Sequence, residues 1–201
     1  MQKFATPAPI AAVLDIPAGL VQLIASDRDD TAVEVRPADA SKSRDVKAAE
    51  RTLVEFTDGV LRIKGDSGNQ ILGSSGTVEV TVQLPSGSRV EAKAASAEFR
   101  GVGRLGDIAY EAAQSDIKID EAASVRLTTQ AGDVTVGSLS GSAEISTQKG
   151  DITVGVAAGL SASMDAGTSY GRISNSLKND GTADLTIRAT TAYGDITARS
   201  L

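Results

Sequence analysis

A short signature of glycine, acid and aliphatic residue recurs through the second half of this 201-residue chain. Three copies are nearly identical: Gly132-Asp133-Val134, Gly150-Asp151-Ile152 and Gly194-Asp195-Ile196. Gly171-Arg172-Ile173 is a variant, and weaker copies occur at Ser115-Asp116-Ile117 and Ala97-Glu98-Phe99. Self-similar units of this length cannot bury an apolar face alone, so the repeat predicts units that stack on one another and share a core.

The residues that flank the signature repeat as well. Residues 125–130 align with residues 143–148 and, less closely, with residues 185–190. Aliphatic residues alternate with Thr, Ser, Lys or Glu, as in Val134-Thr135-Val136 and Ile152-Thr153-Val154. This period of two is typical of strands with one face in a core, so each unit is expected to contribute two strands.

Stacked units would share one interior, lined by Leu127, Ile145, Met164 and Ile187. They would also place one column of aliphatic side chains beside the acids, formed by Val134, Ile152 and Ile196. We therefore predict an all-β protein in which residues 89–201 form a parallel β-helix-like solenoid of repeated rungs. An antiparallel β-sandwich is the alternative.

Residues 1–88 are expected to form a less regular β region that continues into the solenoid. Asp58-Gly59 divides residues 53–63 into two aliphatic runs and predicts a hairpin, because this dipeptide tolerates positive φ angles. Residues 77–84 alternate and predict a strand. The apolar stretch 8–25 is interrupted by Asp15 and Pro17, which favours two strands and a turn over an export signal or membrane span.

Two further segments of the first half have distinct compositions. Residues 41–51 form the only plausible helix, with Ser43 or Asp45 as its N-cap, although a loop is the alternative. Residues 66–76 are rich in Gly and Ser and are expected to form a mobile loop.

Composition excludes several classes of function. The chain has no His, Cys or Trp and only three Phe and three Tyr. Without histidine it lacks the commonest general base and metal ligand, and with few aromatic residues it lacks stacking platforms for sugars or bases. Its 26 acidic and 20 basic residues give a net charge of -6, which opposes binding to nucleic acid. We expect no cofactor, no nucleic-acid partner, no membrane insertion and a cytoplasmic location.

The recurring signature, the segment Val82 to Ser88 and the opening strands resemble a bacterial family of β-strand-repeat proteins of unknown function, labelled "putative adhesin". The resemblance covers the chain and implies a right-handed, parallel β-helix-like fold with a place at the cell surface. The family's motifs are structural and assign no active-site residues. The chain departs from the pattern at Arg172, which occupies an acidic position.

The candidate interaction site is a ladder on one edge of the stack, formed by Glu98, Asp116, Asp133, Asp151, Asp195, Tyr170 and Tyr193. Stacked carboxylates could hold calcium. We expect instead that each acid sits in a turn and accepts backbone amides. Arg172 would lie between Asp151 and Asp195 and relieve their repulsion. The two tyrosines are expected to pack on each other.

These features favour a noncatalytic, adhesin-like binding or scaffold module with a protein or cell-envelope partner. The alternative is a β-helical carbohydrate-active enzyme, a lyase or hydrolase, for which the nearest catalytic set is Asp116, Lys118, Arg126 and Asp133. Only three residues follow the last unit, residues 193–198. We therefore expect the C-terminal rung to be an open end that forms a homo-oligomer or lies under the N-terminal region.

Overall fold

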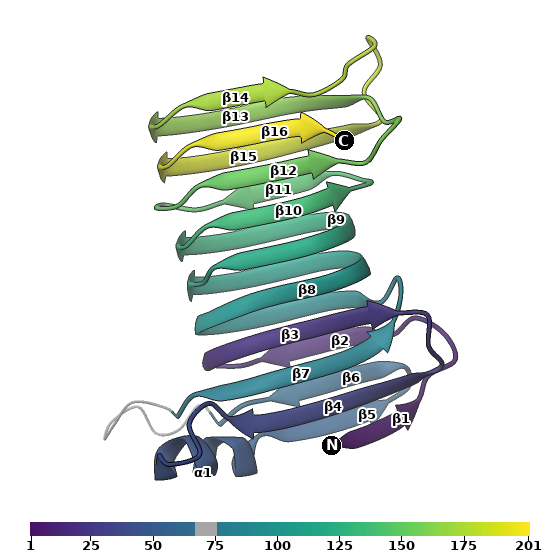
Figure 1. Cartoon of the computed structure of the whole chain (residues 1–201), viewed down its shortest axis with the longest axis vertical. Helices are drawn as coiled ribbons and strands as arrows, with labels where there is room; N and C mark the ends of the chain where they lie inside the picture. Colours follow the sequence, from purple (N-terminus) through teal and green to yellow (C-terminus); the bar gives the residue numbers. More distant parts are fainter. Residues whose placement is uncertain (67–75) are drawn as a thin grey trace.

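The computed structural model describes residues 1–66 and 76–201, and these form an all-β protein with a single short helix among them (Figure 1). The elements are β1 (Gln2–Ala5), β2 (Ala11–Asp15), β3 (Ala18–Ser26), β4 (Asp30–Pro37), α1 (Ser43–Arg51), β5 (Leu53–Thr57), β6 (Val60–Lys64), β7 (Val78–Pro85), β8 (Arg89–Gln114), β9 (Ile117–Ala131), β10 (Val134–Leu139), β11 (Ala143–Ser146), β12 (Ile152–Val156), β13 (Ala162–Tyr170), β14 (Ile173–Ser176), β15 (Leu185–Tyr193) and β16 (Ile196–Ser200).

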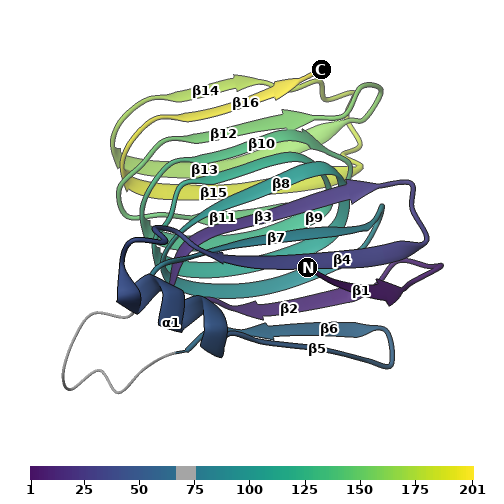
Figure 2. The same ribbon diagram turned by 60° about the horizontal axis from the view of Figure 1, so that its bottom comes forward.

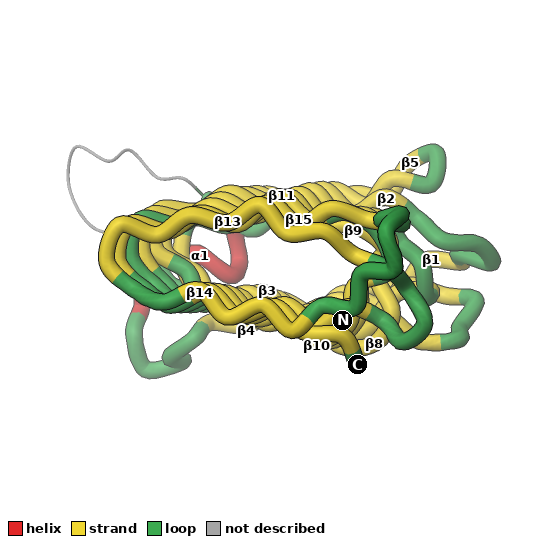
Figure 3. Tube along the Cα trace, turned by 90° about the horizontal axis from the view of Figure 1, so that it is seen from above, coloured by secondary structure: helices red, strands yellow, loops and turns green. Residues whose placement is uncertain are grey.

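The strands form two layers of a flattened coil, which Figure 3 shows end-on. The first layer runs β4, β7, β3, β8, β9, β10, β12, β16 and β14. The second layer runs β5, β6, β2, β8, β9, β11, β15 and β13. β8 and β9 appear in both because each bends around a corner: residues 89–93 of β8 pair with β2, whereas residues 96–102 pair with β3. One second-layer strand and one first-layer strand make a rung.

The pairings between rungs are parallel and in register, as the repeat predicts. Val134 aligns with Ile152, and Ile152 aligns with Ile196. These three side chains are 0–1% exposed, so the predicted aliphatic column is a core column. Among the described residues, the antiparallel pairs are β1–β4, β4–β7 and β5–β6, all within residues 1–88.

The parallel stack also includes strands that precede residue 88 in the sequence, because β2 and β3 pair in parallel with β8.

The predicted order of the last two rungs is wrong. The rung of β15 and β16 lies between the rung of β11 and β12 and the rung of β13 and β14, although it comes last in the chain (Figure 1). The C-terminal rung is therefore paired on both sides, and the open end predicted for it belongs to residues 162–176. The predicted alignment of residues 185–190 is also shifted by two positions, since Ala143 aligns with Ile187.

The glycine of the signature is required by the close approach of neighbouring rungs. Gly150 has a φ of +147°, and a Cβ placed on it would lie 2.0 Å from the carbonyl oxygen of Gly132 in the rung below. No side chain fits at this distance, and L-residues rarely adopt this backbone conformation. The turns before Asp133, Asp151 and Asp195 therefore need glycine for two independent reasons.

The N-terminal end of the stack is covered by elements outside the repeat (Figure 2). The hairpin of β5 and β6 turns at Asp58 and Gly59, with φ values of +52° and +75°, as predicted. α1 packs on β4 and β7 and buries Ala48 against the core. Figure 3 shows it across the far end of the coil.

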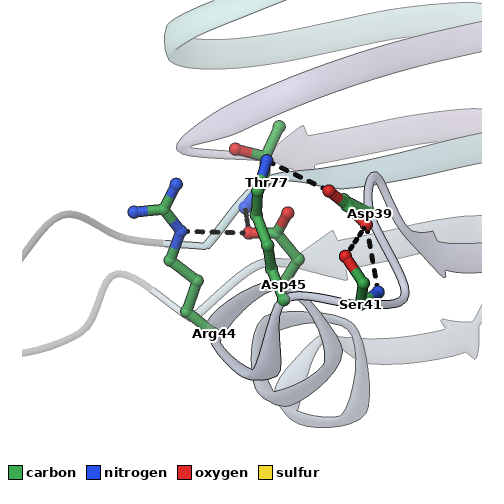
Figure 4. Close-up of polar contacts among 6 residues, drawn as sticks. Asp39, Ser41, Arg44, Asp45 and Thr77 are labelled. Atoms are coloured by element: carbon green, nitrogen blue, oxygen red, sulfur yellow. Dashed lines mark hydrogen bonds and ion pairs between the residues drawn. The ribbon is translucent and has the colours of Figure 1, made fainter.

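The predicted helix is present, but its predicted cap is wrong. Lys42 is the N-cap residue and makes no side-chain capping bond. Asp45 is 2% exposed and accepts a hydrogen bond of 2.9 Å from the amide of Thr77, which anchors the first turn of α1 to the residue that precedes β7 (Figure 4). The side chain of Arg44 lies 3.6 Å from the same carboxylate. Most of the loop predicted at residues 66–76 lies outside the described residues.

Candidate functional site

Four acids of the predicted ladder stack along one edge and bind the backbone of the next rung. In each step, a carboxylate oxygen accepts the amide of the equivalent residue one rung further along: Asp133 N to Asp116 (3.0 Å), Asp151 N to Asp133 (2.8 Å), Asp195 N to Asp151 (2.7 Å) and Arg172 N to Asp195 (2.8 Å). We call these five residues the edge ladder. The acids do accept backbone amides, but from a neighbouring rung instead of their own turn.

The order of the rungs corrects the role expected for Arg172. It does not separate Asp151 from Asp195, which are direct neighbours; it follows Asp195 at the end of the ladder. Its guanidinium lies 3.3 Å from the second carboxylate oxygen of Asp195. The carboxylate of Glu98 instead pairs with Arg100 of its own strand, at 2.7 Å.

Tyr170 and Tyr193 stack on each other, as expected. Their ring centroids are 4.9 Å apart and their planes differ by 4°. Both rings are exposed, at 68% and 57%, and Lys149 aligns with Tyr193 on the other side. The pair therefore adds an aromatic surface to the edge that carries the acids.

A second surface, not predicted from the sequence, lies on the outer face of the second layer. Arg126, Glu144, Arg188 and Asp165 occupy equivalent positions on four successive rungs, in that order. All four are exposed, and their charges alternate in sign along the stack. Arg126 and Glu144 form an ion pair of 3.1 Å. We call these residues the charge column.

The charge column borders a shallow groove of about 690 Å³. Arg89, Glu91 and Asp107 line its N-terminal part, and small side chains such as Ala109 and Ser142 lie among the charged ones. Exposed ion pairs of this kind contribute little to stability, typically about 0.2–1 kcal/mol. The groove therefore presents donors and acceptors of both signs at the spacing of the rungs, with no excess of one charge.

From the sequence, Arg126 was named only in the nearest catalytic set, and the other members of the charge column were missed. The signal was present in the repeat: once residues 187–190 are aligned with residues 143–146, Arg126, Glu144 and Arg188 fall at one position. The shifted alignment of the last unit hid it.

The four residues nearest to a catalytic set do not converge. Asp116 and Asp133 lie on the edge ladder, and Lys118 faces outward from the first layer. Arg126 lies on the outer face of the second layer, in the groove. Within residues 1–66 and 76–201, no group of three or more acidic side chains is placed to hold a metal ion. No helix of that same part of the chain is long and apolar enough to cross a membrane.

A family model matches the stack that carries both surfaces. Residues 105–200 match the Toastrack DUF4097 family. This Toastrack segment contains the edge ladder and the charge column, and the match confirms the resemblance to a family of unknown function. No curated protein matches the chain.

Several solved structures are similar to the whole chain. One is described as a "putative cell adhesion protein" from Clostridium sporogenes; it is 11% identical, with a TM-score of 0.46, and the match covers 100% of this chain and 98% of that one. Another is described as a "putative adhesin" from Bacteroides fragilis; it is 13% identical, with a TM-score of 0.45, and the match covers 98% of this chain and 95% of that one.

Proposed function

We propose that the chain is a noncatalytic β-solenoid module that binds a protein or cell-envelope partner along the groove beside the charge column. The observation that supports this most directly is the groove itself, which spans several rungs and carries exposed Arg and Glu side chains in alternation. Arg126 and Glu144 are 75% and 62% exposed, so a partner could replace their mutual ion pair with contacts of its own.

A rod of in-register rungs suits such a role because its side chains are held at fixed intervals. Rungs lie about 4.8 Å apart, so the charged groups form a regular array of donors and acceptors. An extended partner segment with charges of both signs would match this array, whereas a uniformly charged polymer would meet repulsion at every second rung. We also propose that the coil is right-handed.

The edge ladder supports a structural role for the acids. One oxygen of each ladder acid already accepts a backbone amide, so these carboxylates hold the rungs together. A carbohydrate-active enzyme would need acids that converge on one substrate bond. In the set of residues nearest to a catalytic site, Asp116 and Arg126 instead face different sides of the rod.

Affinity capture of envelope and cytosolic fractions with matched variants tests the proposal. Arg126→Ala combined with Arg188→Ala alters the groove, and Arg100→Ala combined with Lys118→Ala is the control, because these residues face outward from the first layer. We expect a partner that the control retains and the groove variant loses. Equal capture by both variants would contradict the groove as the binding site. Release of reducing ends from polysaccharides by the purified chain would contradict the noncatalytic role.

A further inference from the structure

The rung of β13 and β14 differs from the inner rungs in having a free edge. Among the described residues, β13 pairs with β15 and β14 pairs with β16, and neither has a second partner strand. The Ser161 carbonyl accepts the amide of Leu185, so Ser161 directs its backbone groups toward β15. Alternate residues of a strand point the opposite way, so Met164 and Ala166 direct theirs away from the stack, as Ala162 does when it donates its amide to Lys178 and not to β15.

The same edge exposes apolar side chains that are buried in every equivalent rung below. Ile173 occupies the column of Ile196 and Ile152, yet it is 46% exposed, whereas those two are 1% and 0% exposed. Met164 is partly exposed, although Ile187 beneath it is fully buried. An apolar edge with free backbone groups is the combination that pairs with another strand.

We propose that this edge docks a second copy of the chain through the same rung, related by a two-fold axis parallel to the strands. Such an axis lays β13 of one copy over β14 of the other, antiparallel, and covers the exposed interior of both. It uses one surface twice, as symmetric dimers do. The result is a continuous rod with the N-terminal ends facing outward.

Charges on the rung favour this reversed arrangement. β13 carries Asp165, whereas β14 is bordered by Arg172 and Lys178. Laying β13 on β14 therefore brings an acid of one copy toward the cationic strand of the other. It also places the exposed ring of Tyr170 near Arg172 of the second copy, an arrangement that favours a cation–π contact.

Head-to-tail stacking fits the structure less well. The other end of the rod is occupied by α1 and by antiparallel strands. It would also bring Asp165 toward Glu55, which aligns with Arg62 at that end, so like charges would meet. Furthermore, Arg172 has no carboxylate to accept the amide of a following rung, so the edge ladder cannot continue in parallel.

Sedimentation velocity of the full chain over a concentration series tests the proposal. The interface is one rung wide, so we expect a reversible dimer with a Kd of roughly micromolar order. Ile173→Lys places a charge on the edge and should weaken the dimer at least about tenfold. Leu53→Lys is the matched control, because Leu53 is a 61% exposed aliphatic residue at the opposite end, and it should leave the dimer unchanged.

A second variant separates loss of pairing from loss of folding. Ala166→Pro removes an amide that points away from the stack and leaves the backbone bonds between β13 and β15 in place. It should weaken the dimer while the circular dichroism spectrum stays that of the wild type. A wild-type chain that stays monomeric at millimolar concentration would overturn the proposal. Dimers unaffected by both edge variants, or lost in Leu53→Lys, would also overturn it.

Discussion

The two ends of the rod solve the same physical problem in different ways. At the N-terminal end, α1 and antiparallel strands cover the last parallel rung, and buried Asp45 holds α1 to Thr77. At the other end, β13 and β14 leave Ile173 exposed. The comparison shows that a repeated unit cannot terminate itself, since each copy is built to receive another. Termination needs either residues outside the repeat or a partner.

The largest expected effect comes from the glycine of the inner rungs. Gly150→Ala should cost about 4 kcal/mol or prevent folding, because it adds steric overlap with the Gly132 carbonyl to an unfavourable φ. Gly59→Ala, at the hairpin of the capped end, also has a positive φ but no neighbouring atom within 4 Å, and should cost only about 1 kcal/mol. Urea unfolding measures both. Equal losses of stability would show that the close approach of the rungs adds nothing to the cost of Gly150→Ala.

Truncation of one aliphatic column compares an inner rung with the open end. Ile152→Ala should cost about 3 kcal/mol, because it leaves a cavity in the core. Ile173→Ala, in the same column but 46% exposed, should cost less than about 1 kcal/mol at concentrations where the chain is monomeric. Chemical denaturation measures both values. A large loss for Ile173→Ala in the monomer would mean that the end is covered by the chain itself.

The same carboxylate–amide bond can be compared in buried and exposed settings. Asp45→Ala should cost about 2 kcal/mol, because the amide of Thr77 loses its partner beside a buried site. Asp151→Ala should cost about 1 kcal/mol or less, because water can reach the amide of Asp195 on the exposed edge. Thermal unfolding measures the losses. The reverse ranking would make the edge ladder the stronger anchor.

The smallest expected effects are losses of stability at low pH. Each end of the rod has one aspartate with a lowered pKa that contributes to them. Hydrogen bonds from Ser41 lower the pKa of Asp39 from 3.8 to about 2, and a hydrogen bond with Ser161 is the main cause that lowers the pKa of Asp180. Because the folded pKa is lowered, each contribution to stability is present above pH 3.8 and is lost as pH falls through the folded pKa, which is about 2 for Asp39. Asp39→Asn and Asp180→Asn should each flatten the stability profile in this window. Unfolding measured at a series of pH values checks this, and a profile identical to the wild type would contradict it.

Most of the stack could be predicted because its contacts are those between neighbouring repeats. Alternation fixes which side chains face the interior, and the signature fixes the register of Val134 on Ile152. The order of the last rungs was missed because near-identical units can stack on one another in any order. The deciding residue is Arg172: a rung without the acid cannot bind the amide above it, so it belongs at the end. Asp45 was missed for a different reason, because its partner, Thr77, is distant in sequence.

The insertion of the final rung has a consequence for how the protein is made. β13 and β14 have no described partners except β15 and β16, so residues 162–176 leave the ribosome before the strands on which they rest. Domains made during translation begin to fold from the N-terminus, but here the closing step must wait for residues 185–200. We expect nascent chains halted after residue 184 to lose residues 162–184 to a protease while the preceding rungs survive; resistance of that segment would exclude late closure.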